Sequence, residues 1–261
     1  MTTNESENRP DFSLVIPAYN EEALLPRLLL TVDAARARYT RGADHIEVIV
    51  ADNMSTDRTA EIARAWGCRV ARVEKRRIAA ARNGGAAIAR GEVLCFTDAD
   101  GQIHPDTFNA IRAAMGSGRY IAGATGVTLE RLSLGISTAY LMLMPLVWSA
   151  GMDTGVVFTR REDWAAVGGY REDKRYAEDV QFLWDLKRLG WKRRQRLVRL
   201  RRAKAIASTR KFDTFGDWHY PRMVIKAPLQ FLFARKTYDR LIHNYWYGSR
   251  DSAPTESNHR R

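Results

Sequence analysis

The chain is poor in cysteine and histidine, with two cysteines and five histidines among 261 residues. Cys68 and Cys95 lie far apart in different apolar stretches. They show neither the paired spacing of a zinc site nor the framework of a small disulfide-stapled protein. This usage suits a reducing compartment, so we expect a cytoplasmic protein. Because 45% of the residues are hydrophobic, the chain can bury a substantial core, which argues against wholesale disorder.

Acidic residues are in the minority: 42 basic and 30 acidic side chains give a net charge of +12. This balance suggests an anionic partner, whether nucleic acid, a negative membrane surface or a phosphorylated substrate, and charge alone does not choose among them. The first residues also lack the apolar core of a signal peptide. Since residues 1–11 and 249–261 are polar, we expect both segments to be disordered.

Long uncharged runs are rare, and one stands out. Residues 132–152 contain 21 residues without a charge, which is long enough to be a candidate transmembrane helix. Serines, a threonine, two glycines and Pro145 dilute its hydrophobicity. The placement of the acidic residues on either side of it, considered below, bears on this question.

Strand and helix patterns alternate through the first half of the chain. Apolar runs predict strands at 12–17, 45–52, 68–74 and 92–100. Between and after them we expect helices at 21–37, capped by Asn20, at 55–67, at 75–91, interrupted by Gly84-Gly85, and at 104–118. This alternation predicts an α/β fold with a mostly parallel sheet flanked by helices.

The second half is less regular. We expect a strand at 119–130, a strand, short helix and glycine turn within 154–170, an amphipathic helix at 177–191 and a basic segment at 192–204. No internal repeat and no long linker divides the core. The predicted organisation is therefore one domain at 12–210 and an aromatic, basic helical extension at 211–248.

Polar residues follow three of the predicted strands, at 17–20, 52–53 and 98–100. In parallel sheets ligands bind beyond the carboxyl ends of the strands, so these segments could line one cleft. Asp52 could accept a hydrogen bond from a nucleobase or a ribose, or it could cap the next helix. Similarly, Asp179 at the start of the 177–191 helix could act as a general base, or it and Glu178 could simply favour the helix dipole.

Asp98 and Asp100 stand one residue apart. Such like charges repel, so either water disperses the repulsion in a solvated turn, or a cation binds there. A small set of hard oxygen ligands suits Mg²⁺ or Mn²⁺, which keep waters and share phosphate oxygens. A calcium loop of the EF-hand type is disfavoured, because Gly101 comes too early and no glutamate closes the loop.

Four segments in order resemble family 2 inverting glycosyltransferases, whose fold is called GT-A. They are VIPAYNEE (15–22), ADNMSTDRTAEIA (51–63), ARNGGAAIARGEVLCFTDAD (81–100) and AEDVQFLWDLKRLG (177–190). Each is weak alone, and their order makes the resemblance specific. The chain departs from the family after the second strand, where Asp52-Asn53-Met54 replaces two acids and a glycine, so Asn53 has no implied role.

The resemblance implies a role for each matching residue. Asp179 would be the catalytic base, supported by Glu178. Asp98 and Asp100 would form the site for Mg²⁺ or Mn²⁺, with Asp100 holding the ion on the diphosphate and Asp98 near the ribose. The loop at 17–19 would lie beside the nucleotide base. The implied donor-binding residues are Pro17, Ala18, Tyr19, Glu21, Asp52, Arg82, Asp98 and Ala99.

The resemblance thus implies metal-dependent transfer of a sugar from a nucleoside-diphosphate sugar to an acceptor hydroxyl or phosphate, with inversion. A saccharide, a lipid and a polyprenyl phosphate all remain open as acceptors. A membrane crossing at 132–152 would separate Asp100 from Asp179, so we expect a buried helix there or one in the membrane interface. Residues 187–204 carry ten basic side chains, which form either a solvated face or a surface for anionic lipid on the inner face of the membrane.

Two other functions compete with this one. A sugar-phosphate nucleotidyltransferase would normally have a glycine-rich first loop, which PAYNEE lacks. A catalytically inactive basic module on the same fold would bind nucleic acid or membrane, whereas nucleic acid is not an expected partner of the transferase. His219 is either a late metal ligand or, more commonly for a histidine among aromatic residues, a packing residue.

Overall fold

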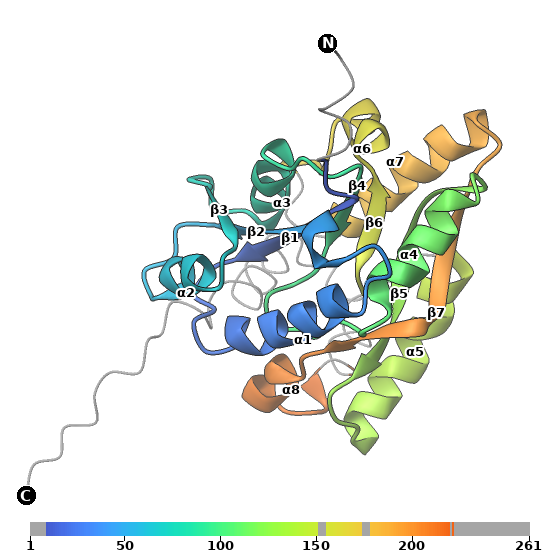
Figure 1. Ribbon diagram of the computed structural model, residues 1–261. Coiled ribbons are helices and arrows are strands. Elements are labelled where there is room, and N and C mark those ends of the chain that lie inside the picture. Colours follow the sequence, from blue (N-terminus) through green and yellow to red (C-terminus); the bar gives the residue numbers. More distant parts are fainter. Residues whose placement is uncertain (1–8, 151–154, 174–177, 220, 222–261) are drawn as a thin grey trace, which may run out of the picture. The chain divides into compact units, whose positions relative to one another are not determined.

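The computed structural model describes residues 9–150, 155–173, 178–219 and 221 (Figure 1). The strands in these residues are β1 (Phe12–Ala18), β2 (Ile46–Asp52), β3 (Arg69–Arg72), β4 (Val93–Phe96), β5 (Tyr120–Leu129), β6 (Val157–Arg160) and β7 (Arg196–Ala207). The helices are α1 (Leu25–Ala37), α2 (Thr59–Ala65), α3 (Ile78–Ala87), α4 (Thr107–Gly116), α5 (Leu134–Ala150), α6 (Arg161–Val167), α7 (Glu178–Lys192) and α8 (Arg210–Phe215), with a 3-10 turn, η1 (Ala43–His45).

The chain divides into two compact units. The first runs to Arg131 and resumes at Met144–Thr209, and it contains the whole sheet. The second consists of Leu132–Leu143 and the chain from Arg210 onward, so His219 belongs to it. The residues of the candidate site described below lie in the first unit.

The sheet has seven strands in the order β3-β2-β1-β4-β6-β5-β7. β1 pairs in parallel with β2 on one side and β4 on the other, whereas β6 is antiparallel to both of its neighbours. The chain therefore leaves β3 at one edge, passes over β2 and β1 through α3, and enters β4 on the other side of β1. This reversal of strand order is a topological switch point at the carboxyl ends of β1 and β4, where α/β sheets commonly bind ligands.

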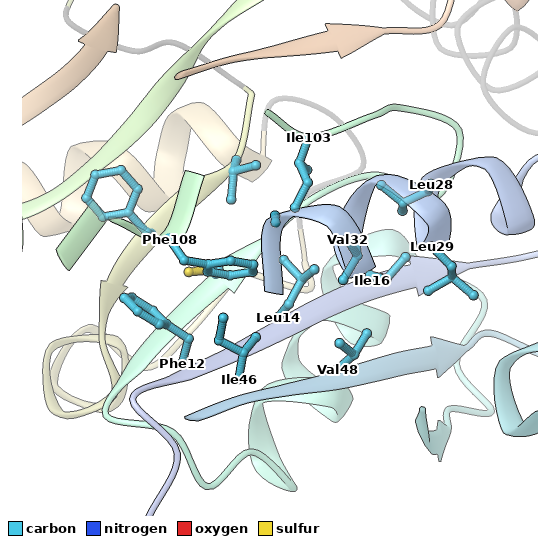
Figure 2. Packing of buried hydrophobic residues seen from close by; sticks show 14 of the residues in the cluster. Phe12, Leu14, Ile16, Leu28, Leu29, Val32, Ile46, Val48, Ile103 and Phe108 are labelled. Carbon is cyan, nitrogen blue, oxygen red and sulfur yellow. The ribbon is translucent and has the colours of Figure 1, made fainter. Parts of the chain in front are cut away.

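Two apolar layers cover the sheet. On one face α1, α2 and α4 pack against even-numbered residues of β1, including Leu14 and Ile16, and Figure 2 shows the side chains of α1 and α4 meeting them. On the other face α3, α6 and α7 cover odd-numbered residues such as Val15. β1 is buried along its whole length, as expected for the central strand of a parallel sheet with helices on both faces.

Helix α1 begins later than the sequence predicts. It starts at Leu25 with Pro26 in its first turn, and Asn20 is not its cap. Asn20 instead has a φ of 51°, and its Oδ1 accepts a hydrogen bond from the Thr56 N–H at 2.9 Å. The expectation of a helix from 21 capped by Asn20 was therefore wrong, because residues 20–22 bond to the loop before α2.

The sequence suggested that the glycine pair would interrupt α3, and this expectation was wrong. α3 runs unbroken through Gly84 and Gly85. A Cβ at Gly85 would lie 2.4 Å from Val15 Cγ1, and one at Gly84 would lie 2.4 Å from Val73 Cγ2. The pair therefore allows α3 to approach the sheet closely, at the cost of some helix propensity.

Two other elements differ from expectation. The basic segment forms most of β7, a twelve-residue edge strand paired in parallel with β5. The first part of the uncharged stretch is not uniformly buried: Ile136 is buried, but Leu134 and Leu141 are exposed. Within the described residues, the structure has no helix with both the length and the apolar character needed to cross a bilayer.

Candidate active site

The carboxyl ends of β1 and β2 bring the first predicted donor residues together. Ala18 and Asp52 are partners in the parallel register, and the Asn53 N–H donates to the Ala18 carbonyl at 2.8 Å. Asp52 is largely buried, and its Oδ1 accepts a hydrogen bond from the Ser55 N–H at 3.1 Å. Asp52 therefore shapes the loop that follows β2, and this local role accompanies any contact with a ligand.

Asn53 has a structural role that the sequence did not reveal. Its side-chain amide donates to the carbonyls of Val73 and Lys75 at 3.0 and 2.7 Å. These bonds fasten the chain beyond β3 to the end of β2. The fastened segment carries Arg76, whose guanidinium lies 4.3 Å from the centre of the Tyr19 ring. A cation thus lies over an aromatic face directly after β1.

The rest of the predicted donor loop is mostly interior. Pro17, Ala18 and Ala99 are buried, so they can reach a ligand chiefly through backbone atoms. Glu21 is also buried, and its N–H donates to Thr59 Oγ1 at 2.8 Å. This hydrogen bond joins the loop after β1 to the start of α2, so Glu21 supports the loop.

The two aspartates after β4 lie in a tight turn. Thr97 N–H still donates to Val15 of the central strand, and the Gly101 N–H then closes a turn onto the Asp98 carbonyl at 3.4 Å. The Asp98 side chain is 56% exposed, and Asp100 is half-buried. The backbone therefore turns at Ala99, between the two aspartates.

Arg82 links this turn to α7. It lies on α3, and its side chain is only 5% exposed. Its Nη2 donates to Asp98 Oδ1 at 3.0 Å, and its Nη1 donates to Glu178 Oε1 at 2.8 Å. The same Nη1 lies 2.6 Å from Asp179 Oδ1. Three predicted site residues that are distant in the sequence therefore meet on one buried guanidinium.

Asp179 has the environment of a proton acceptor. Its side chain is 23% exposed, and its Oδ1 is ion-paired with Arg82 Nη1 without the angular geometry of a hydrogen bond. Burial is the main reason that its pKa is raised to about 7; the attraction of Arg82 opposes the shift, and the Glu178 and Asp98 carboxylates add to it. A carboxylate with a pKa near neutrality can both accept and release a proton under physiological conditions.

Tyr170 and Glu172 support the site and were missed from the sequence. The Arg82 guanidinium lies 5.1 Å from the centre of the buried Tyr170 ring, which stacks on Phe182 of α7. Glu172 accepts hydrogen bonds from Lys75 at 2.6 Å and Asn83 at 3.0 Å. Only their position after a glycine turn hinted at them, since their partners lie on distant elements.

A divalent cation fits this site if the substrate completes its coordination. In the described part of the chain, no cluster of three or more His, Cys, Asp or Glu side chains could hold a metal alone. However, three carboxylates surround Arg82, leaving two negative charges unbalanced when all are ionised. Asp98 is one of these three carboxylates, and Asp100 follows it in the same turn. Together they offer a sparse set of oxygen ligands, which suits an ion that also takes diphosphate oxygens and water.

Residues 13–134 match the family model described as glycosyl transferase family 2. This part of the chain is a family 2 glycosyltransferase domain. The match ends before α7, so it includes Asp52, Arg82, Asp98 and Asp100 but not Asp179. The family proposed from the sequence is confirmed.

Curated relatives share this family 2 domain. Validoxylamine A glucosyltransferase from Streptomyces hygroscopicus subsp. limoneus is 38% identical over 112 residues, which are 40% of this chain and 24% of the relative. Undecaprenyl-phosphate 4-deoxy-4-formamido-L-arabinose transferase from Pseudomonas paraeruginosa is 38% identical over 113 residues, 40% of this chain and 32% of the relative. The aligned segment thus spans about a quarter to a third of these relatives' length.

A solved structure extends the likeness in fold beyond the family 2 domain. The mannosyltransferase PcManGT from Pyrobaculum calidifontis, in complex with GDP-Man and Mn²⁺, superposes with a TM-score of 0.59. The superposition covers 76% of this chain and 57% of that chain at 23% identity. The predicted α/β fold of the GT-A type is confirmed.

Proposed function

We propose that this protein transfers a sugar from a nucleoside-diphosphate sugar to an acceptor, with inversion at the anomeric carbon. The observation that carries the proposal is the meeting of Asp98, Glu178 and Asp179 on the buried Arg82 guanidinium. The glycosyltransferase names of the relatives, and the nucleotide sugar in the structure of similar fold, support it.

The donor would bind across the carboxyl ends of β1, β2 and β4. Asp52, the register partner of Ala18, would accept a hydrogen bond from the nucleobase, and Tyr19, whose ring lies against the Arg76 guanidinium, would lie beside that base. Arg82 is a buried cation that is ion-paired with three acids, one of them Asp98 of the proposed metal-binding turn. A diphosphate entering here would compete with those acids for the guanidinium.

Asp179 would remove the proton from the acceptor oxygen, which in a phosphate acceptor is the single proton of its monoanionic form. That oxygen attacks the anomeric carbon, the bond to the diphosphate breaks, and its electron pair leaves with the nucleoside diphosphate. Because attack and departure occur on opposite faces of the sugar, the configuration inverts. Glu178 accepts a hydrogen bond from Arg82 and would therefore share its positive charge with Asp179. Asp179 would then keep more of its ability to accept a proton, and in this way Glu178 would support the base.

Asp98 and Asp100 would hold Mg²⁺ or Mn²⁺. Such an ion, when bound, stabilises the negative charge that develops on the departing diphosphate. Mn²⁺ in the structure of similar fold supports this assignment. Because His219 lies in the second unit, its placement gives no information about this site.

The proposed acceptor is a lipid phosphate. The name of the Pseudomonas relative includes undecaprenyl phosphate, and the basic segment of this chain would favour an anionic surface. The protein would then work as a peripheral protein at the inner face of a membrane.

The first test measures donor binding and product together. In a thermal-shift panel of UDP-, GDP-, dTDP- and CDP-linked sugars with Mn²⁺, the true donor should raise the melting temperature by mass action. Incubation of that donor with polyprenyl phosphate should release nucleoside diphosphate and yield a glycolipid of inverted configuration, as shown by NMR of its anomeric proton. Chelation should abolish this release and added Mn²⁺ should restore it. A retained configuration would rule out the direct displacement.

The same assay tests the competing enzyme. A sugar-phosphate nucleotidyltransferase would release pyrophosphate from a nucleoside triphosphate and a sugar phosphate, not nucleoside diphosphate. Pyrophosphate release without any glycosylated product would favour that function. Absence of both products, with no donor response in the thermal-shift panel, would leave the inactive binding module.

A further inference from the structure

Helix α7 has an outer side that packing within the described chain does not explain. Its inner side is conventional: Phe182, Leu183 and Leu186 are buried against the sheet. On the outer side, however, Trp184 is 38% exposed and Trp191 is 67% exposed. A large aromatic side chain left in water gives up the free energy that its burial would provide.

The exposed apolar residues form a narrow stripe together with the half-buried Lys187. Val180, Trp184, Lys187 and Trp191 follow the spacing i, i+4, i+7, i+11, which keeps them on one side of a helix. The Lys187 ammonium lies 4.7 Å from the centre of the Trp184 ring. The stripe thus extends over about 16 Å, from near the first turn of α7 to its end.

Basic side chains without acidic partners surround the distal tryptophan. Arg188 and Arg193 are paired with Asp185 and Asp163. In contrast, the exposed side chains that follow Trp191 have no carboxylate partner in the part of the chain that the structure describes; these are Lys192, Arg194 and Arg196. Further exposed basic residues continue along β7, namely Arg201, Arg202 and Lys204. The apolar stripe is therefore followed along the chain by positive charge that the described residues do not balance.

We propose that this side of α7 docks on an anionic lipid bilayer. We call it the Trp184–Trp191 face and define it as Val180, Trp184, Lys187, Trp191, Lys192, Arg194 and Arg196. Tryptophan prefers the boundary between headgroups and acyl chains, and lysine and arginine are attracted to anionic headgroups. Charge complementarity selects an anionic bilayer over a neutral one.

Docking here would have a consequence for the reaction, and this consequence rests on the proposed function. α7 carries Asp179 in its first turn and the Trp184–Trp191 face on its outer side. If the face lies in the interface, Asp179 is held close to the bilayer surface, within reach of the phosphate of a lipid-linked acceptor. The docking itself requires no catalytic activity.

A site-specific probe tests the contact. Trp191→Cys and, as a matched control, Leu30→Cys are each labelled with an environment-sensitive fluorophore in a Cys68→Ser background. Leu30 is an exposed residue of α1, on the opposite face of the sheet, and Cys95 is buried. At low salt, phosphatidylcholine vesicles containing phosphatidylglycerol should shift the emission at 191 to the blue and leave that at 30 unchanged. No shift at 191, or equal shifts at both positions, would overturn the proposal.

Vesicle flotation of the full chain measures the contribution of each component. Lys192→Gln/Arg196→Gln should weaken binding about 25-fold, since each basic residue near an anionic surface is worth about fivefold. Trp184→Ser/Trp191→Ser should weaken it at least tenfold. Arg58→Gln/Arg64→Gln removes two exposed charges of α2 and its N-cap, on the face of the sheet opposite α7, and should change binding less than twofold. Equal losses in all three double variants would refute docking through α7.

Two further results separate this inference from the proposed function. All surface variants should keep the donor-induced rise in melting temperature, because none of them touches the donor site. Vesicle contact at 191 without any donor response would remove the transferase and keep the docking face. If wild-type protein ignores the vesicles and Trp184→Ser/Trp191→Ser converts a dimer to a monomer in light scattering, a second copy covers the face and the proposal fails.

Discussion

Nη1 of Arg82 lies 2.6 Å from Oδ1 of Asp179, joining a helix in the first half of the chain to one in the second. The guanidinium also bonds to Asp98, so one buried cation contacts both the proposed base and the proposed metal-binding turn. Charge brought by a donor and a cation would redistribute these contacts. The predictions below depend on this arrangement.

Asp179→Asn removes the proposed proton acceptor while keeping its shape. We expect turnover to fall by about 10²-fold or more, with donor binding retained, because general-base catalysis contributes roughly that much. Release of nucleoside diphosphate measures turnover, and calorimetry measures donor binding. Glu178→Gln is the matched control and should cost less. Near-normal turnover in Asp179→Asn would remove this residue from the mechanism.

The pH dependence of turnover should reflect the same carboxylate. Burial raises the pKa of Asp179 to about 7, and only the ionised form accepts a proton. Turnover should therefore fall as the pH drops below 7 and level off above it. Arg82→Met removes an attraction that lowers this pKa, so the residual activity should show its acid limb at higher pH. A profile that stays level across pH 7 in the wild-type protein would contradict the assignment.

Asp52 has two roles that substitution can separate. Asp52→Asn keeps an oxygen that can accept from the Ser55 N–H but loses the charge, so donor affinity should fall ten- to a hundredfold with little change in melting temperature. Asp52→Ala should in addition lower the free energy of unfolding by about 1 kcal/mol. Titration of donor by calorimetry, with parallel thermal unfolding, distinguishes the two. Equal donor affinity in Asp52→Asn and wild type would leave this residue only its loop role.

Gly85→Ala should destabilise the fold. The added Cβ would lie 2.4 Å from Val15 Cγ1 in the central strand, and overpacking of this kind costs about 1–3 kcal/mol. Gly116→Ala, at the last residue of α4 with no atom within 4 Å of the added Cβ, is the control and should be neutral or stabilising by up to about 1 kcal/mol. Denaturant unfolding measures both. Equal stability of the two variants would mean that α3 can move away from the sheet at little cost.

The local sequence was sufficient to predict the alternation of strands and helices up to α4 and the start of α7, although not the start of α1 or the continuity of α3. Periodic apolar residues and glycine turns act over a few residues, so they can be read without knowing what packs where. The order of four motifs similarly led to the correct family and to Asp52, Asp98, Asp100 and Asp179 as candidates. What these motifs could not convey is which of the candidates touch one another.

Only the tertiary structure decided several other features. The basic segment became strand β7 because β5 offers it a parallel partner. The glycine pair proved to be part of the packing of α3 on the sheet, because Val15 and Val73 leave no room for side chains at these two positions. Arg82 became the centre of the site because distant chain segments surround it with acids. These outcomes depend on contacts between residues far apart in the chain, whose energies exceed the weak local preferences that a sequence displays.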